Sequence, residues 1–334
     1  MSNSSAFRKC LHNPRRVTII STVRGRRPHY TKVSAELESK IFCPFCPGNE
    51  KHTPPATLVL AKSSEGKYCF LKEKRSGEIG NWIVRVFPNK YPALIPKANS
   101  DLTYGHHEVL VETRIHNEEE YLKDPENIYF ALKTLKERIK RILEDSRIKH
   151  VIVIKNKGAR AGASITHPHL QIFANTFVPP EIEEEIYGFK KYYEENGKCP
   201  LCYLVSTRKE LVFYTNEFFA SLIAYTPRVP YETYIVPLKH TFSFLSMGDD
   251  EILSLSRALS KTMLGLRKVL GDFDYNFWFH MVYESSLKFY HWHIEILPLT
   301  TTWGGYEKGS GVYIVDRFPK SAASELRKAI SSGT

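Results

Sequence analysis

Cysteine and histidine recur along this chain in the same order and with related spacing. Each copy has a Cys-x-x-Cys pair, a single histidine and the first histidine of a His-x-His sequence: Cys43, Cys46, His116 and His167, then Cys199, Cys202, His240 and His291. In both copies, 51 residues separate the single histidine from the His-x-His sequence. Two thiolates and two imidazoles satisfy the tetrahedral coordination of Zn²⁺ and leave no open position for a substrate. The pattern therefore predicts a duplicated unit with two structural zinc sites per chain.

The two copies differ just after the His-x-His sequence. Gln171 lies two residues after His169, whereas Glu295 holds the corresponding position after His293. Because alternate side chains of a strand share a face, His167, His169 and Gln171 are expected to line one surface. The first copy is therefore the candidate reactive one.

A glycine-containing loop precedes the first His-x-His sequence. Its backbone amides, helped by polar side chains, could hold phosphate oxygens. The candidate phosphate-binding residues are Asn156, Arg160, Gly162 and Ser164. A phosphate and an imidazole would then meet at one place.

Composition sets the class of protein but not its ligand. The 334 residues are 42% hydrophobic, enough for a large core, and contain neither an apolar run long enough to span a membrane nor an N-terminal signal core. A cytoplasmic protein is expected, and in a reducing compartment Cys-x-x-Cys pairs are more often metal ligands than disulfides. The net charge of +11 attracts polyanions from nucleotide sugars to nucleic acids without choosing between them.

Periodicity predicts the elements that position these residues. Helical spacing of apolar residues indicates amphipathic helices at 126–145 and 249–270, each lying between the single histidine and the His-x-His of its copy. Strands are expected at 107–112, 149–156, 231–237 and 275–284, and from each His-x-His onward. A polar, non-periodic segment at 190–198 suggests a boundary between halves 1–190 and 191–334.

Together these motifs resemble the galactose-1-phosphate uridylyltransferase family of the histidine-triad superfamily. The resemblance is carried by an Arg-x-x-Arg-Pro sequence at 24–28, Cys43-Pro-Phe-Cys46-Pro-Gly-Asn at 43–49, the loop at 156–164, His-Pro-His-x-Gln at 167–171, and the tail at 305–314. It implies an α+β fold of two histidine-triad-like halves, each an antiparallel sheet with a packed helix, joined in one pseudo-symmetric unit. It also implies a homodimer whose sites borrow residues from the neighbouring subunit.

The resemblance implies ping-pong nucleotidyl transfer with His169 as the nucleophile. A neutral imidazole can attack the α-phosphorus, and the covalent nucleotidyl-histidine divides the exchange into two steps. Gln171 would donate to a phosphate oxygen, and because a carboxamide cannot act as a general acid or base, transfer is favoured over hydrolysis. A carboxylate at Glu295 would repel an α-phosphate, so His293 is not expected to be a second nucleophile.

Other family positions map onto residues elsewhere in this chain. Residues around the nucleotide would be Arg24, Arg27, Phe87 and Asn89, and residues contacting the hexose would be Tyr306, Glu307 and Lys308. An arginine fork suits pyrophosphate oxygens and an aromatic face can stack on a base. Core packing remains an alternative for Phe87, and a surface loop remains an alternative for the tail.

The second metal site has two possible ligand sets. In one branch of the family a glutamate and three histidines bind this metal, which would correspond to Glu185, His280, His291 and His293. The Cys-x-x-Cys pair favours the Cys₂His₂ set, a pattern shared with ADP-glucose phosphorylase-like relatives. Six further histidines have no partner pattern and are expected to lie at the surface or to be incidental: His12, His29, His52, His106, His107 and His150.

Three functions remain on sequence grounds. The preferred one is exchange of UMP between UDP-glucose and galactose 1-phosphate through uridylyl-His169, and the nearest alternative is an ADP-glucose phosphorylase in which the same histidine carries AMP to phosphate. The partners would be a nucleotide sugar and a sugar 1-phosphate or phosphate, with no nucleic acid and no membrane. A zinc-dependent nucleic-acid-binding protein would also explain the charge, but the intact His-Pro-His-x-Gln sequence argues against it.

Overall fold

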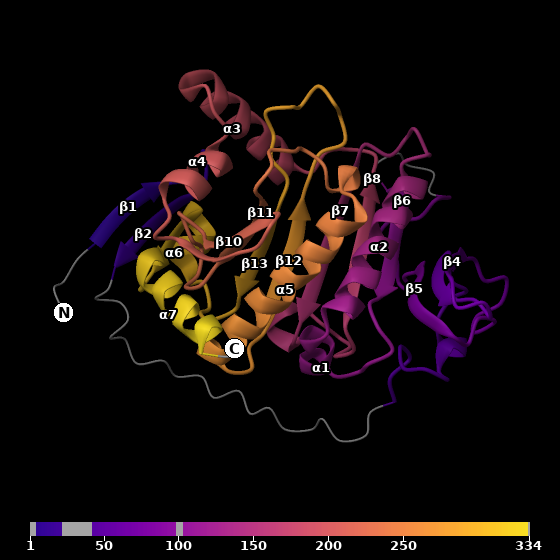
Figure 1. Ribbon diagram of the computed structural model, residues 1–334. Coiled ribbons are helices and arrows are strands. Elements are labelled where there is room, and N and C mark those ends of the chain that lie inside the picture. The colour runs from indigo at the N-terminus through magenta and orange to yellow at the C-terminus, as the bar shows by residue number, and fades with distance from the viewer. Residues whose placement is uncertain (1–4, 22–41, 98–102, 333–334) are drawn as a thin grey trace.

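In the part of the chain that the structure describes, an antiparallel sheet of eleven strands runs through both halves of the molecule (Figure 1). The computed structural model describes residues 5–21, 42–97 and 103–332. The strand order is β4-β3-β5-β6-β8-β7-β12-β13-β11-β10-β9, so the two halves meet where β7 pairs with β12. The predicted α+β class is confirmed.

The first half supplies six strands of this sheet. Its elements are β3 (Leu58–Lys62), β4 (Tyr68–Leu71), β5 (Trp82–Pro88), β6 (Gly105–Val111), α1 (Glu118–Lys123), α2 (Pro125–Ile142), β7 (His150–Lys157) and β8 (His169–Asn175), with 3-10 turns at Glu50–His52 and Ala159–Ala161. Helix α2 begins where sequence rules place a start, because the Asp124 carboxylate accepts from the Glu126 N–H and Pro125 holds the first helical position. The helix predicted at 126–145 is confirmed.

The second half repeats the pattern with additions. Its elements are α3 (Pro180–Asn196), α4 (Pro200–Thr207), β9 (Val212–Thr215), β10 (Phe219–Ile223), β11 (Thr233–Pro237), a 3-10 turn at Phe244–Ser246, α5 (Asp249–Leu270), β12 (Tyr275–His280), β13 (His293–Pro298), α6 (Gly305–Ser310), β14 (Val312–Val315) and α7 (Pro319–Ser331). Helix α5 has the predicted bounds and is followed by Gly271. The strand predicted at 275–284 ends earlier, at His280.

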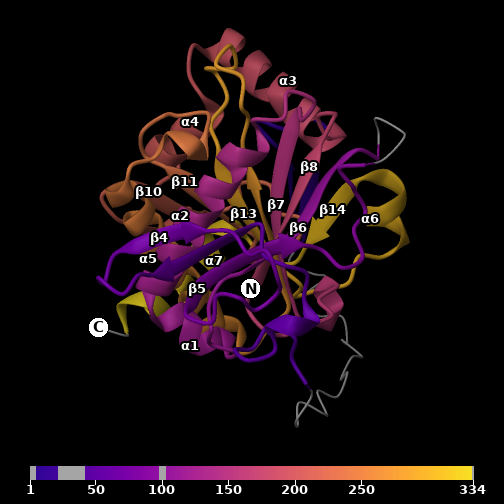
Figure 2. The ribbon, with the colours of Figure 1, turned by 90° about the vertical axis from the view of Figure 1, so that its right-hand side faces the viewer.

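Helices α2 and α5 cover one face of the sheet and pack against each other (Figures 1 and 2). Strand residues that face them, such as Leu170, Ile172, Ile294 and Ile296, are buried in one continuous core. Alternation then turns His169, Gln171, His293 and Glu295 to the opposite face. The helices thus support the sheet from behind while the chemistry-bearing side chains lie on the other side.

The opposite face of the second half is covered within the chain itself. Strands β1 (Ser5–Lys9), β2 (Val17–Ser21) and β14 form a small sheet, in which β14 runs parallel to β2. Viewed from the β4 and β5 end, this small sheet and α6 lie on the side away from α2 and α5 (Figure 2). Helices α3 and α4 pack there as well, around Phe189, Leu201 and Tyr234.

The segment expected to be a non-periodic boundary is mostly helical. Helix α3 continues to Asn196 and stops at Gly197, which has a left-handed φ of 64°. The boundary between halves 1–190 and 191–334 stays a prediction. No helix of residues 5–21, 42–97 and 103–332 is long and apolar enough to cross a membrane.

Candidate functional site

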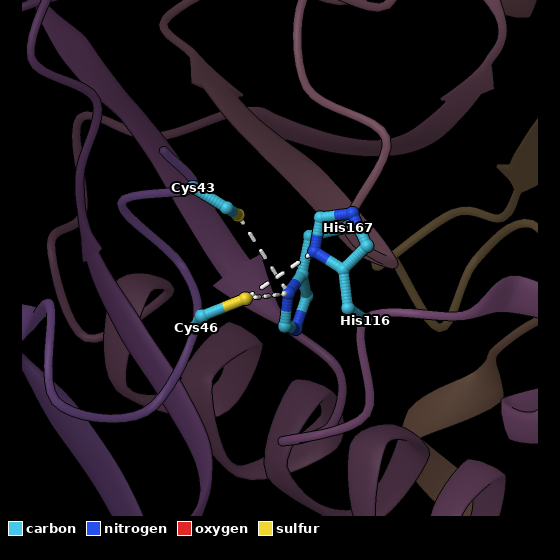
Figure 3. Close-up of side chains that lie close together, drawn as sticks. All are labelled: Cys43, Cys46, His116 and His167. Atoms are coloured by element: carbon cyan, nitrogen blue, oxygen red, sulfur yellow. Dashed lines mark hydrogen bonds between the residues drawn. The ribbon is translucent and has the colours of Figure 1, made fainter. Parts of the chain in front are cut away.

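The first Cys/His group comes together beside the sheet, at the end of strand β6 and the beginning of strand β8 (Figure 3). Cys46 Sγ lies 3.3 Å from His116 Nδ1 and 3.6 Å from His167 Nδ1, and Cys43 Sγ lies 3.8 Å from His167 Nδ1. All four ligand atoms lie within 4.8 Å of one another. The sequence correctly predicted this grouping across more than a hundred residues of chain.

Backbone contacts orient the buried histidine of this cluster. His167 Nε2 donates to the Thr113 carbonyl at 2.8 Å, which leaves Nδ1 as the unprotonated nitrogen facing the thiols. A ligating histidine typically donates its other N–H in this way. The sulfur–nitrogen distances of 3.3–3.8 Å match the ~3.5 Å edge of a tetrahedron with zinc–ligand bonds of about 2.0–2.3 Å. The residues present therefore fit Zn²⁺.

The second cluster has the same geometry in the other half. Cys199 Sγ lies 3.5 Å from His291 Nδ1, and Cys202 Sγ lies 3.5 Å from the Nδ1 atoms of both His240 and His291. His240 Nε2 donates to the Lys288 carbonyl at 2.7 Å. His291 is thus grouped with the two thiols, as the Cys₂His₂ set requires.

The alternative ligand set does not come together with His291. Glu185 instead accepts from His280 Nδ1 at 2.9 Å and lies beside His12 and His293 in a buried group that also contains Glu295. Two arginines enter this group. Arg16 Nη1 donates to Glu295 at 2.7 Å with Nη2 3.7 Å from Glu185, and Arg228 Nη2 donates to Glu295 at 2.6 Å.

These guanidinium groups supply the positive charge that the two buried carboxylates need. Their coulombic effect holds the pKa of Glu295 well below its usual range, against the opposing effect of burial. A divalent cation placed between the carboxylates would repel Arg16 at close range. The second copy of the His-x-His face is therefore filled by an internal ion network.

The geometry of His169 leaves one ring nitrogen free. His169 Nδ1 donates to the His167 carbonyl at 2.8 Å, so the neutral ring keeps its lone pair on Nε2. The side chain is 7% exposed, and burial lowers its pKa. Phe45 from the Cys-x-x-Cys loop packs edge-on against it, with ring centroids 5.3 Å apart. The first cluster thus fixes both the strand and one wall around this imidazole.

Gln171 lies on the same face and contacts a residue that sequence reasoning set aside. The Gln171 Oε1 atom lies 2.8 Å from His107 Nε2, and His107 also contacts Asn89 at 3.1 Å. The structure therefore brings together Asn89 and Gln171, two of the predicted site residues. The expectation that His107 lies at the surface or is incidental is wrong, because the residue is buried and bonded to Gln171. The pairing of β6 with β8, which sets His107 opposite Phe173, makes this contact possible.

The loop at 156–164 is shaped by the second half. Arg160 N–H donates to the Asp274 carboxylate at 2.9 Å, and the Asn276 amino group donates to the Ala161 carbonyl at 2.9 Å. Gly158, with φ of 88°, approaches Asp274 so closely that a Cβ would lie 1.9 Å from its carboxylate oxygen. The side chains of Arg160 and Ser164 are exposed, and Asn156 is half-buried.

Register places this loop beside the imidazole. Ile154 pairs with Gln171 in antiparallel β7 and β8, so Asn156 lies two residues further along the same face, toward His169. The loop that contains the four residues predicted to hold phosphate thus begins at the end of β7, the strand that pairs with the one bearing His169.

A family model of the galactose-1-phosphate uridyl transferase N-terminal domain matches residues 84–179, which include His116, His167, His169, Gln171 and the loop at 156–164. An ADP-glucose phosphorylase of Arabidopsis thaliana is 31% identical over 332 residues, covering 94% of this chain and 90% of the relative. The chain belongs to the galactose-1-phosphate uridylyltransferase family. It is a nucleotidyltransferase of that family.

Two further relatives are similar over nearly the whole chain. A galactose-1-phosphate uridylyltransferase of Thermotoga maritima is 29% identical over 324 residues, 93% of this chain and 94% of the relative. The crystal structure of an ADP-glucose phosphorylase from Arabidopsis thaliana with bound ADP-glucose superposes with a TM-score of 0.83 at 31% identity, covering 97% and 99% of the two chains. The family's fold therefore extends through both halves.

Not every position mapped from the family lies near His169. Arg24 and Arg27 fall outside the described residues. Phe87 is 1% exposed and packs against Phe45 with centroids 5.7 Å apart, which favours core packing over base stacking. The tail residues Tyr306, Glu307 and Lys308 form helix α6 in the second half, where Glu307 accepts from the Gly304 N–H at 2.9 Å and caps the helix.

Two more histidines treated as incidental are buried. His12 lies 3.9 Å from Glu185 and packs against the ring of His293. His150, the first residue of β7, packs against Tyr283. Neither contact has a sequence signal, because both partners of each pair are more than a hundred residues apart.

Proposed function

We propose that this family member transfers the nucleotidyl group of a nucleoside diphosphate glucose to a phosphate acceptor through His169, with ADP-glucose as the donor. One observation carries the proposal. The Nδ1 atom of His169 is held by the His167 carbonyl at 2.8 Å, so the nucleophilic lone pair stays on Nε2 of a neutral ring. An imidazole held in this way is ready to attack phosphorus without losing a proton first.

The chemistry divides into two displacements. In the first, the His169 Nε2 lone pair forms a bond to the α-phosphorus, the bond from that phosphorus to the bridging oxygen breaks, and glucose 1-phosphate leaves. In the second, an oxygen of the acceptor phosphate attacks the same phosphorus and the phosphorus–nitrogen bond breaks, returning neutral His169. No proton has to be shuttled by the protein, which agrees with a carboxamide rather than an imidazole at Gln171.

Donors around His169 would stabilise the phosphoryl group as its charge redistributes. The side chains of Gln171 and Asn156 lie on the same side of the sheet as the imidazole, and the exposed side chains of Arg160 and Ser164 belong to the adjoining loop. The backbone N–H groups of residues 160–163 bond within the protein, so these side chains rather than those amides would be the donors. Preorganised donors of this kind typically contribute a factor of about 10²–10³ each to the rate.

The adenine nucleotide is proposed for two reasons. The Arabidopsis ADP-glucose phosphorylase is 31% identical to this chain, and its structure superposes over 97% of the chain. The second cluster is of the Cys₂His₂ type that the sequence resemblance links to that branch. Uridylyl exchange with a hexose 1-phosphate is the second candidate, supported by the 29% identity to the Thermotoga enzyme over 93% of the chain.

Zinc is proposed for both Cys₂His₂ clusters. The first would be held by Cys43, Cys46, His116 and His167, and the second by Cys199, Cys202, His240 and His291. Bound there, the ion would supply a rigid crosslink, which at the first cluster joins the 43–46 loop to the start of β8.

The tail residues of α6 lie in the second half of the chain, away from His169. We therefore propose that a second copy of the chain presents its α6 to the site around His169.

The experiment is to incubate the protein separately with ADP-glucose and UDP-glucose and to weigh the intact chain. An adenylyl adduct supports the proposal, a uridylyl adduct supports the second candidate, and no adduct with either contradicts both. His169→Ala should abolish labelling. His293→Ala is the matched control, because it removes the equivalent histidine of the other copy and should leave labelling in place.

A further inference from the structure

A carboxamide stabilises a phosphate only when it faces the right way. Its amino group donates hydrogen bonds, whereas its oxygen accepts them and repels a phosphate oxygen. The two ends have nearly the same shape, so a ligand pocket that uses Gln171 and Asn156 needs something to set their orientation. Hydrogen bonds on the side away from the ligand can do so.

The orientation of Gln171 follows from a backbone N–H. Ala93 N–H donates to His107 Nδ1 at 3.1 Å, so Nδ1 carries no proton and the neutral ring holds its proton on Nε2. The Nε2 atom is 2.8 Å from the Gln171 oxygen, which accepts this hydrogen. The amino group of Gln171 is thereby turned away from His107.

The neighbouring amide cannot take over this role. Asn89 Oδ1 accepts the Tyr91 N–H at 2.8 Å, so its amino group is the end that faces His107 Nε2 at 3.1 Å. Two N–H groups cannot bond each other, which leaves Gln171 as the acceptor. The ring itself is held flat against Phe173, with centroids 3.9 Å apart and an interplanar angle of 22°.

The orientation of Asn156 follows from a backbone carbonyl. One hydrogen of the Asn276 amino group goes to the Ala161 carbonyl at 2.9 Å, which identifies that end of Asn276 as the donor. Its other hydrogen goes to Asn156 Oδ1 at 2.7 Å. The Asn156 amino group therefore points away from Asn276. Asn276 lies on β12, so the second half orients a side chain of the first.

We propose that His107 and Asn276 are positioning residues that hold the amino groups of Gln171 and Asn156 toward the phosphate. This inference rests on the proposed nucleotidyl transfer. Each chain of bonds begins at a backbone atom of fixed polarity, the Ala93 N–H in one case and the Ala161 carbonyl in the other. The family resemblance assigns neither residue a role.

A pair of substitutions separates orientation from local packing at His107. His107→Gln keeps a donor near the Nε2 position but loses the acceptor for Ala93, whereas His107→Asn keeps an acceptor near Nδ1 but loses the donor to Gln171. We expect His107→Asn to slow nucleotidylation of His169 about tenfold, the worth of one hydrogen bond. His107→Gln should recover most of the rate. Equal rates in the two variants, or a larger loss in His107→Gln, would overturn the assignment.

A nearly isosteric change tests the second position more strongly. Asn276→Asp replaces the donor by acceptor oxygens and should turn the Asn156 amide round, placing its oxygen against the phosphate. We expect kcat to fall about 100-fold with KM little changed, as for loss of a transition-state donor. In an Asn156→Ala background the same substitution should cost less than about twofold, because its effect passes through Asn156. Full additivity would refute the role.

Failure of the proposed function is distinguishable from failure of this inference. If the wild-type protein forms no adduct, nucleotidyl transfer is refuted, and calorimetry with AMP, UMP and their nucleosides tests orientation alone. Asn276→Asp should then weaken binding of the nucleotide but leave the nucleoside unchanged. If the wild-type adduct forms and every positioning variant matches its rate, the proposed function stands and the positioning roles fall.

Discussion

Glu295 holds together the ion network that fills the second His-x-His face, and its neutral analogue is the sharpest test of that network. The carboxylate is fully buried and accepts from Arg16 at 2.7 Å, Arg228 at 2.6 Å and Trp278 Nε1 at 3.1 Å. Glu295→Gln keeps the shape but removes the charge and one acceptor oxygen. Two guanidinium groups then lose their shared carboxylate inside the protein.

The expected loss of stability depends on the hydrogen-bond partners that Arg16 and Arg228 keep in the variant. Removing one partner of a buried ion pair typically costs about 3–5 kcal/mol, because the other charge remains buried. Arg16 keeps a bond to Glu181 and Arg228 keeps bonds to Glu232. We therefore expect the lower end of the range, about 3 kcal/mol of the free energy of unfolding.

Urea unfolding followed by tryptophan fluorescence measures this loss directly. Glu65→Gln is the control, because Glu65 forms an exposed ion pair with Lys67 and such pairs contribute no more than about 1 kcal/mol. If Glu295→Gln lowers the free energy of unfolding by less than about 1 kcal/mol, or no more than the control does, the desolvation of the buried charges offsets their attraction and the network is not what stabilises this half.

Three further predictions concern the site, the metals and the response to acid. Gln171→His should increase release of free nucleotide from the labelled protein, measured by chromatography, since an imidazole can transfer protons to and from water; unchanged hydrolysis would contradict the proton-transfer argument. Cys46→Ser and Cys202→Ser should each lower the metal content from two zinc ions per chain to one, measured by plasma mass spectrometry, and two ions in either variant would argue against the assigned ligands. Burial lowers the pKa of His150 to about 3, so the unfolded chain binds a proton between pH 6.5 and 3 that the folded chain does not. As the pH is lowered through that window, the free energy of unfolding should decrease by up to about 1.4 kcal/mol per pH unit, and His150→Phe should make this decrease shallower. A pH profile of the variant that runs parallel to that of the wild type would refute this.

Local patterns in the sequence predicted the helices in which apolar residues recur at clear helical spacing. The helices at 125–142 and 249–270 have apolar residues at helical spacing and recognisable ends, so their bounds could be predicted within a few residues. Both Cys₂His₂ clusters could be predicted because the ligand types and their repetition carry the information. No helix was predicted at Pro180–Asn196, and the last turns of α3 are mostly exposed and charged, without apolar residues at helical spacing.

Contacts that depend on strand register could not be predicted. His107 alternates with Val109 and Val111 along β6, but its contact with Gln171 requires knowing that β6 pairs with β8 and in which register. Arg16 precedes β2 and its partner Glu295 lies 279 residues away in the chain, so this contact has no local signal either. One signal could have marked His107. It lies on a strand, β6, that leads along the chain to His116, a predicted metal ligand.

The pairing of β7 with β12 has a consequence for how this molecule could have diverged from its ancestor. Because that junction lies in the middle of the sheet, separating the copies would expose two long central strands as unpaired edges. The carboxyl-terminal copy could therefore lose its own reactivity without becoming dispensable. Its strand β12 still delivers Asn276, and the residue just before that strand, Asp274, to the loop of the amino-terminal copy. Selection on one centre would then preserve both copies, including the two cysteines and two histidines that come together in the second one.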